Sequence, residues 1–140
     1  MSGQRVIAAC EAVWDKDKSD CSAFARDVAA RLGVTLSGNA DAIVDAMRRK
    51  WTRLDNGATA CAVAAAGQLV IAGLKGSEQQ EPSAHGHVVV VVSGPLAHDK
   101  YPSAYWGRLG GVGARNKTLN YAWRSGDRDT VTYATMPIVG

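Results

Sequence analysis

The apolar positions in the first half of the chain repeat at helical spacing. One stripe of a first predicted helix, over about residues 4–15, carries Val6, Ile7, Cys10, Val13 and Trp14. A second helix is predicted from Cys21 to about Leu32, and a third from Asn39 or Ala40 to about Leu54. The alanine-rich residues 58–66 can form a short fourth helix. The pattern therefore predicts a helical N-terminal half.

The second half of the chain has the pattern of strands. Residues 69–74 are predicted as a first strand, and His87 opens a second in which five consecutive valines indicate burial on both faces. Further strands are predicted at 101–109 and 130–135, a flexible turn at 110–113, and either a helical turn or a strand at 118–124. Helices followed by strands, with no internal repeat or linker, predict one α+β domain over residues 1–140 with a small antiparallel sheet.

Cys21 has a special position in this plan, at the start of the second predicted helix. Ser19 and Asp20 precede it, and both residue types cap helix N-termini. The unpaired N–H groups of a first helical turn and the positive end of the helix dipole favour a thiolate there. Cys21 is therefore a candidate nucleophile with an acidified thiol. Its own backbone N–H is a candidate donor to an oxyanion, and Ser22 either positions the turn or caps it.

Composition and charge exclude several classes of protein. Apolar residues make up 46% and charged residues 21%, as in ordinary globular domains, and the net charge is only +3. The one basic cluster, residues 48–50, falls on a helix with an apolar opposite face and is interpreted as a solvated surface, so no nucleic-acid partner is predicted. Without a transmembrane span or an apolar signal region, the chain is expected to be made in the cytoplasm and exported by another route.

The three cysteines resemble neither a disulfide framework nor a metal site. Cys10 and Cys61 lie in apolar runs and are predicted to be small core residues. No metal and no cofactor are therefore predicted, and Cys21 alone has polar neighbours.

Three histidines could act as the base. His87 stands where a loop meets the valine strand, so rigid backbone would hold its side chain at the edge of a cleft. His85 and His98 fall in loops and are expected to be exposed, although a second role for His85 stays open. A cysteine helix followed by a histidine strand is the chain order of papain-like folds.

Four segments together resemble a known family. They are Asp20-Cys21-Ser22-Ala23-Phe24, residues 38–45 (GNADAIVD), residues 69–76 (LVIAGLKG) and residues 86–96 (GHVVVVVSGPL). In this order they are similar to the first family of type VI secretion amidase effectors, within the NlpC-type cell-wall cysteine peptidases. The resemblance extends from about residue 4 to about residue 136.

The resemblance implies a papain-like NlpC-type fold with the nucleophile at a helix N-terminus. It implies hydrolysis of the γ-D-glutamyl to meso-diaminopimelate bond of peptidoglycan stem peptides, with Cys21 as nucleophile and His87 as base. It further implies export by the type VI machinery, action in a target cell's periplasm, and a cognate immunity protein that inhibits the enzyme.

The chain also departs from its relatives. The loop before the nucleophile, residues 15–20, is short, and the cysteine pair that joins the chain ends in some members is absent: Arg5 stands near the first position, and no cysteine follows residue 61. The group that orients His87 is open, because residues 101–108 contain no acid or amide and Asp99 falls in a turn. Two alternatives also stay open: a papain-like amidase or acyltransferase with another substrate, and a non-catalytic murein-binding relative.

Overall fold

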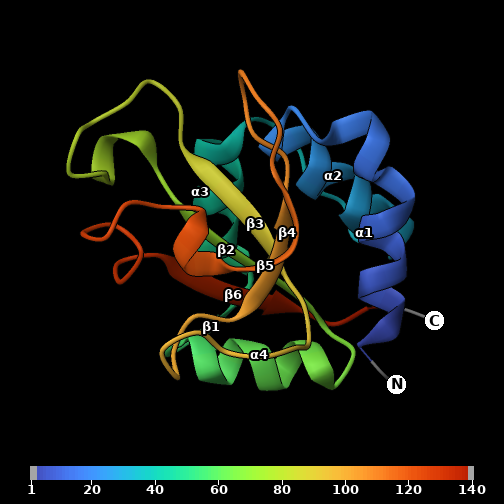
Figure 1. Cartoon of the computed structure of the whole chain (residues 1–140). Helices are drawn as coiled ribbons and strands as arrows, with labels where there is room; N and C mark the ends of the chain where they lie inside the picture. The colour runs from blue at the N-terminus through green and yellow to red at the C-terminus, as the bar shows by residue number, and fades with distance from the viewer. Residues whose placement is uncertain (1–2, 139–140) are drawn as a thin grey trace.

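The computed structural model describes residues 3–138, in which helices cover both faces of one antiparallel sheet (Figure 1). Met1 and Ser2, part of the segment interpreted as lacking a signal sequence, lie outside the described residues, as do residues 139–140. The helices are α1 (Gln4–Asp17), α2 (Cys21–Arg31), α3 (Ala40–Lys50), α4 (Gly57–Ala65) and the 3-10 turns η1 (Gly76–Glu78) and η2 (Leu119–Tyr121). The strands are β1 (Thr52–Leu54), β2 (Leu69–Leu74), β3 (His87–Val91), β4 (Ser103–Trp106), β5 (Ala114–Thr118) and β6 (Thr132–Met136).

The valine strand β3 lies inside the sheet, whose order is β1-β6-β2-β3-β4-β5. It is antiparallel to β2 along its whole length, with Leu74 opposite His87, and it pairs with β4 at Val90 and Val91. All five valines are at most 1% exposed, which confirms the predicted burial on both faces. The first residues of β3, from His87 to Val89, have no partner in β4, whose register pairs are Val90 with Tyr105 and Val91 with Ala104.

Alternation along β3 divides the interior into two cores, one on each face of the sheet. Val88 and Val90 pack with the helices α1, α2 and α3. Val89 and Val91 pack with α4, with Leu119 of η2 and with two tryptophans of the C-terminal half. The predicted α+β class with N-terminal helices on an antiparallel sheet is confirmed. Between residues 3 and 138, no helix has the length and apolar character needed to cross a bilayer.

The start of α2 forms as the sequence predicts. The Asp20 side chain accepts a hydrogen bond from the Ala23 N–H at 3.1 Å, and the Ser22 hydroxyl donates to the same oxygen at 3.0 Å. Asp20 is thus the N-cap, and Ser22 supports it. Cys21 is consequently the first residue of the helix.

The prediction was wrong at the end of the third helix and at both ends of the third strand, and it missed β5, whereas the helical-turn alternative for part of 118–124 is confirmed as η2. The third helix ends at Lys50 instead of Leu54, because residues 52–54 extend and pair with β6 as the edge strand β1. The strand predicted at 101–109 covers only Ser103–Trp106. Beyond the turn at 110–113, residues 114–118 form β5 against β4, and the ambiguous segment begins with η2. Pairing with a partner strand decides β1 and β5, and their local sequence carries no strong strand pattern.

Candidate active site

Cys21 lies in the core on the helical side of the sheet, where it is 2% exposed. The N-terminus of α2 packs against β3, and the backbone N–H of Val88 forms a hydrogen bond with the Cys21 sulfur. The N–H groups of Cys21 and Ser22 at the helix start also contact it. Three backbone donors therefore converge on Sγ, as a site that stabilises a developing negative charge requires.

The pKa of the Cys21 thiol is raised above its ordinary value. Burial is the largest cause, and the Asp20 carboxylate adds to it, while the backbone N–H groups of Val88, Ser22 and Cys21 act in the opposite direction. The expectation of an acidified thiol was wrong in its sign. The backbone N–H groups at the helix start do lower the pKa of the Cys21 thiol, but burial raises this pKa by more.

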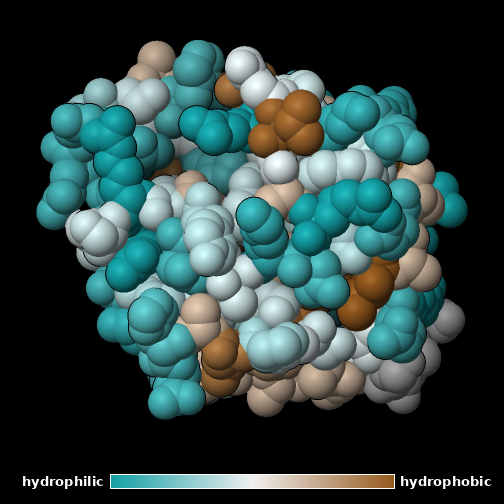
Figure 2. Space-filling model, in the orientation of Figure 1, coloured by the Kyte–Doolittle hydropathy of each residue, from teal (hydrophilic) through white to brown (hydrophobic). Residues whose placement is uncertain are grey.

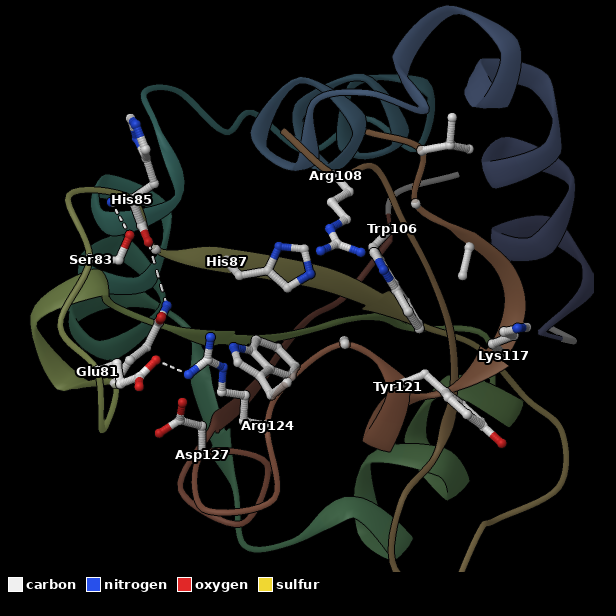
Figure 3. A pocket seen from close by; sticks show the side chains of 17 residues that line it. Glu81, Ser83, His85, His87, Trp106, Arg108, Lys117, Tyr121, Arg124 and Asp127 are labelled. Carbon is white, nitrogen blue, oxygen red and sulfur yellow. Dashed lines mark hydrogen bonds and ion pairs between the residues drawn. The ribbon is translucent and has the colours of Figure 1, made fainter. Parts of the chain in front are cut away.

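His87 is partly exposed in a cleft on the opposite side of β3. Its imidazole packs edge-on against two tryptophans, with ring centroids 5.1 Å from Trp123 and 6.4 Å from Trp106. Figure 3 shows the imidazole in the middle of the cleft, with the guanidinium of Arg108 directed toward it. The cleft has a volume of about 670 Å³ and lies among the β2–β3 loop, the β4–β5 hairpin and the segment after η2.

The pKa of His87 is lowered to about 4, first by burial against the tryptophans and second by the positive charge of Arg108. The imidazole is therefore neutral at physiological pH and able to accept a proton. In the resting protein both the Cys21 thiol and the His87 imidazole are therefore uncharged.

Cys21 and His87 lie close to each other in the structure but are not in direct contact, because the Cys21 thiol meets β3 at Val88, the residue next to His87. The thiol contacts the N–H of Val88, the residue after His87, from the helical side, while the imidazole packs with the core of the other side. Within residues 3–138, no hydrogen bond links Sγ to the imidazole. His85 and Gly86 lie between them: both line the large cleft, and both line a narrow hollow of about 20 Å³ that reaches Cys21.

The group that orients His87, which the sequence left open, is not a side chain in the described part of the chain. No side chain there forms a hydrogen bond with the imidazole, and Asp99 lies in an exposed turn. Trp106, Arg108 and Trp123 surround it instead, and the sequence analysis identified none of them as site residues. The one available signal was that Trp106 and Arg108 fall in the stretch searched for an acid or amide.

A tight backbone contact fixes the loop before Cys21 against the end of β4. The carbonyl of Lys18 accepts hydrogen bonds from the N–H groups of Arg108 (3.1 Å) and Gly113 (2.8 Å). At Gly107 a side chain would not fit, because a Cβ atom would lie 2.3 Å from the Asp17 carbonyl oxygen and 2.6 Å from that of Asp20. The loop that leads to Cys21 and the loop that carries Arg108 thus form one unit.

The other candidate residues lie outside this arrangement. His98 is exposed, as expected, and so is His85 despite its place between the two hollows. Cys10 is fully buried, which confirms its assignment to the core. Cys61 is only partly buried and its thiol donates to the Gly94 carbonyl at 3.4 Å, so its assignment to the core was wrong. Among residues 3–138, no cluster of histidine, cysteine and carboxylate side chains could hold a metal ion.

A thiol at a helix start beside a histidine strand that borders a cleft defines a candidate cysteine hydrolase of the α+β class. Comparison with known proteins gives the family. Over 141 aligned residues the chain is 42% identical to the peptidoglycan amidase Tse1 of Pseudomonas aeruginosa, with 93% of this chain and 88% of that protein covered. No family model matches the chain. At this identity and coverage, the chain belongs to the first family of type VI secretion amidase effectors.

Proposed function

We propose that the chain is a peptidoglycan amidase, delivered as an antibacterial effector by a type VI secretion system. The relationship to Tse1 over nearly the whole chain carries this proposal. It is supported by Cys21 under three backbone donors and by a neutral His87 in an open cleft. The proposed architecture is a papain-like NlpC-type fold, in keeping with a nucleophile that begins a helix packed on the sheet.

The proposed bond is the amide between γ-D-glutamate and meso-diaminopimelate of the stem peptide. In the first step His87 takes the proton of the Cys21 thiol as the sulfur attacks the amide carbonyl. The S–C bond forms, and the carbonyl electrons become an oxyanion next to the N–H groups at the start of α2. The imidazolium of His87 then gives its proton to the leaving amine as the C–N bond breaks.

Water completes the cycle. His87 takes a proton from the water molecule as its oxygen attacks the thioester, and the sulfur leaves and is reprotonated by the imidazolium. The proposal requires the His87 side chain to turn from the tryptophans toward Sγ when substrate binds. Catalytic hydrogen bonds that are long or absent in a free enzyme commonly tighten only in the substrate complex.

The proposed site of action is the periplasm of a rival cell, after synthesis in the producer's cytoplasm. The producer would need a cognate immunity protein to inhibit an enzyme that attacks its own wall. Neither a nucleic acid nor membrane insertion has a part in this proposal.

Digestion of Gram-negative sacculi, followed by mass spectrometry of the products, tests the proposal. We expect stem-peptide fragments with a new free amine on diaminopimelate, and no such products from Cys21→Ala. Cys61→Ala is the matched control, since that thiol bonds to Gly94 away from the cleft, and it should keep full activity. Glycan-strand products, or undiminished products from Cys21→Ala, would refute the assignment.

A further inference from the structure

Arg108 differs from the other cations that line the cleft. Arg124 forms an ion pair with Glu81, and the ammonium of Lys117 lies 5.1 Å from the centre of the Tyr121 ring. Within residues 3–138, the guanidinium of Arg108 has neither an ion pair nor a hydrogen bond, and its side chain is exposed to the cleft. Figure 3 shows it directed at His87, whereas the Arg124 side chain points toward Glu81. The cleft thus holds one arginine whose hydrogen-bond donors are unused.

The backbone of Arg108 is held in place although its side chain is free. Its N–H donates to the Lys18 carbonyl in the nucleophile's loop, and Gly107 before it lies in tight contact with the same loop. Trp106, two residues earlier, packs on the imidazole. The backbone from which the guanidinium extends is therefore fixed relative to both proposed catalytic side chains, which favours a role in orienting substrate.

We propose that Arg108 binds the free α-carboxylate of the γ-linked glutamyl residue on the acyl side of the bond to be cut. This inference rests on the proposed function. When glutamate is linked through its γ-carboxyl, its α-carboxylate stays outside the peptide bond and lies only a short carbon chain from the scissile carbonyl. A guanidinium can bind a carboxylate with two parallel hydrogen bonds, which fixes orientation as well as position. An unused guanidinium beside the catalytic histidine suits that role.

A carboxylate bound to Arg108 would also change the pKa of His87. Besides His87, the charged and titratable side chains of the cleft come from four segments. They are Glu81 and His85 from the β2–β3 loop, Arg108 from the end of β4, Lys117 from β5, and Tyr121, Arg124 and Asp127 from η2 and the segment after it. Of these, Arg108 is the charge that disfavours the imidazolium and lowers the pKa of His87. A carboxylate bound to Arg108 offsets that charge, so substrate itself favours proton transfer to His87.

Two soluble stem-peptide substrates test the contact, one with a free α-carboxylate on the γ-glutamyl residue and one with an α-carboxamide. The unmodified protein should prefer the free acid by about 10- to 100-fold in kcat/KM, as expected for a hydrogen-bonded charge. Arg108→Gln should lose activity on the free acid alone and so abolish the preference, and Arg108→Lys should restore part of it. Arg124→Gln is the control, since that side chain is already paired, and it should keep the preference.

The outcomes separate this inference from the proposed function. If neither substrate is cleaved, the proposed function fails. If both are cleaved equally well by the unmodified protein, or if Arg124→Gln abolishes the preference and Arg108→Gln does not, the role of Arg108 is overturned and the proposed function stands.

An NMR titration of the His87 imidazole in Cys21→Ala gives an independent measurement without turnover. The free-acid peptide should raise the pKa of His87, and the carboxamide should not. In Cys21→Ala/Arg108→Gln, the His87 pKa should start higher and show no response to either peptide. An equal response to the two peptides in Cys21→Ala would contradict the proposed contact.

Discussion

Cys21 and His87 lie in different surroundings on the two sides of β3. On the helical side, Cys21 is enclosed by core residues, and the polar groups in contact with its sulfur are backbone N–H groups. On the cleft side, His87 is enclosed by aromatic rings and surrounded by charged side chains from three loops. Figure 2 shows the face viewed in Figure 1 as mostly hydrophilic, with small separate apolar spots. The proposed nucleophile is thus part of the core, and the proposed base is part of the surface that would meet substrate.

Burial on both sides favours the uncharged forms of the two groups. It raises the pKa of the Cys21 thiol and lowers that of His87 to about 4. A preformed thiolate–imidazolium pair is therefore disfavoured in the resting protein, and proton transfer has to accompany substrate binding. If the protein is made in the producer's own cytoplasm, as proposed, a neutral resting pair would also limit reactions with unrelated electrophiles.

Replacement of His87 is the strongest test of the contrast between the two sides of β3. We expect His87→Gln to lower kcat/KM for the amide by about 10²- to 10⁴-fold, because the amide side chain of glutamine is not basic enough to take the thiol proton. The pH profile of the unmodified enzyme should lose activity only as the pH falls toward 4, where the imidazole of the free enzyme becomes charged.

His85→Gln is the matched control, since His85 lines both hollows from an exposed position. It should keep most of the activity. If His85→Gln abolishes hydrolysis and His87→Gln does not, the base lies in the loop and the two-sided arrangement is wrong.

The contact between the two loops is tested at Gly107. In Gly107→Ala the new methyl group would lie 2.3 Å from the Asp17 carbonyl oxygen, so backbone must move. We expect a loss of about 3 kcal/mol in the free energy of unfolding, measured by urea denaturation. Gly111→Ala is the control: its nearest neighbour would be the Arg108 Cδ at 3.9 Å, and its stability should change by less than about 0.5 kcal/mol. Equal stability of the two variants would show that the loops are not joined at Gly107.

The state of the thiol is tested by alkylation with iodoacetamide. Because the pKa of Cys21 is raised, its rate should increase about tenfold per pH unit from pH 7 to 9, in proportion to the thiolate fraction. Partly exposed Cys61 should react first at neutral pH, and peptide mapping distinguishes the sites. A Cys21 rate that reaches a plateau below pH 8 would instead indicate a thiol acidified by the helix.

The smallest effect concerns Asp17 at the end of α1. The carboxyl is 5% exposed, and one of its oxygens has no hydrogen-bond partner among the described residues. Burial, followed by the neighbouring Asp27, raises its pKa to about 6. The protonated form is thus favoured by folding, and the stability that it contributes is lost as the pH rises from about 4 to about 6.

Asp17→Asn keeps a neutral donor toward Asp27 at every pH. We expect it to stabilise the protein by about 1–2 kcal/mol at pH 7 and to flatten the pH dependence of stability between 4 and 6, measured by urea denaturation. Asp15→Asn, at a side chain that is 97% exposed, should change little. A destabilised Asp17→Asn protein would mean that the charged carboxylate is the favoured form.

Local chemistry made the helical side of the site predictable. Asp20 caps α2 through its own side chain, so sequence alone located Cys21 at the first helical residue. The valine run identified β3 and placed His87 at its start. The direction in which the thiol pKa is shifted could not be predicted in the same way, because burial of Cys21 depends on how α2 packs against β3.

The cleft side was largely beyond prediction. β5 is a mostly exposed edge strand of sequence ARNKT, without apolar alternation, and it forms because β4 pairs with it. Trp106 and Trp123 are far apart in sequence and meet at His87 only after the hairpin and η2 have folded. Long-range pairing creates this surface, and periodicity along the chain does not report it.

The single Lys18 carbonyl that binds both Arg108 and Gly113 has an evolutionary consequence. It closes the segment between them into a loop whose two ends are held at one atom. Residues 109–112 can therefore change in sequence or length without displacing the nucleophile's loop. Leu109 and Val112, which are 49% and 59% exposed, stand in this replaceable segment and line the hollow of Cys21 and the cleft of His87, respectively. Selection on substrate range can act on this loop while the catalytic geometry stays constant.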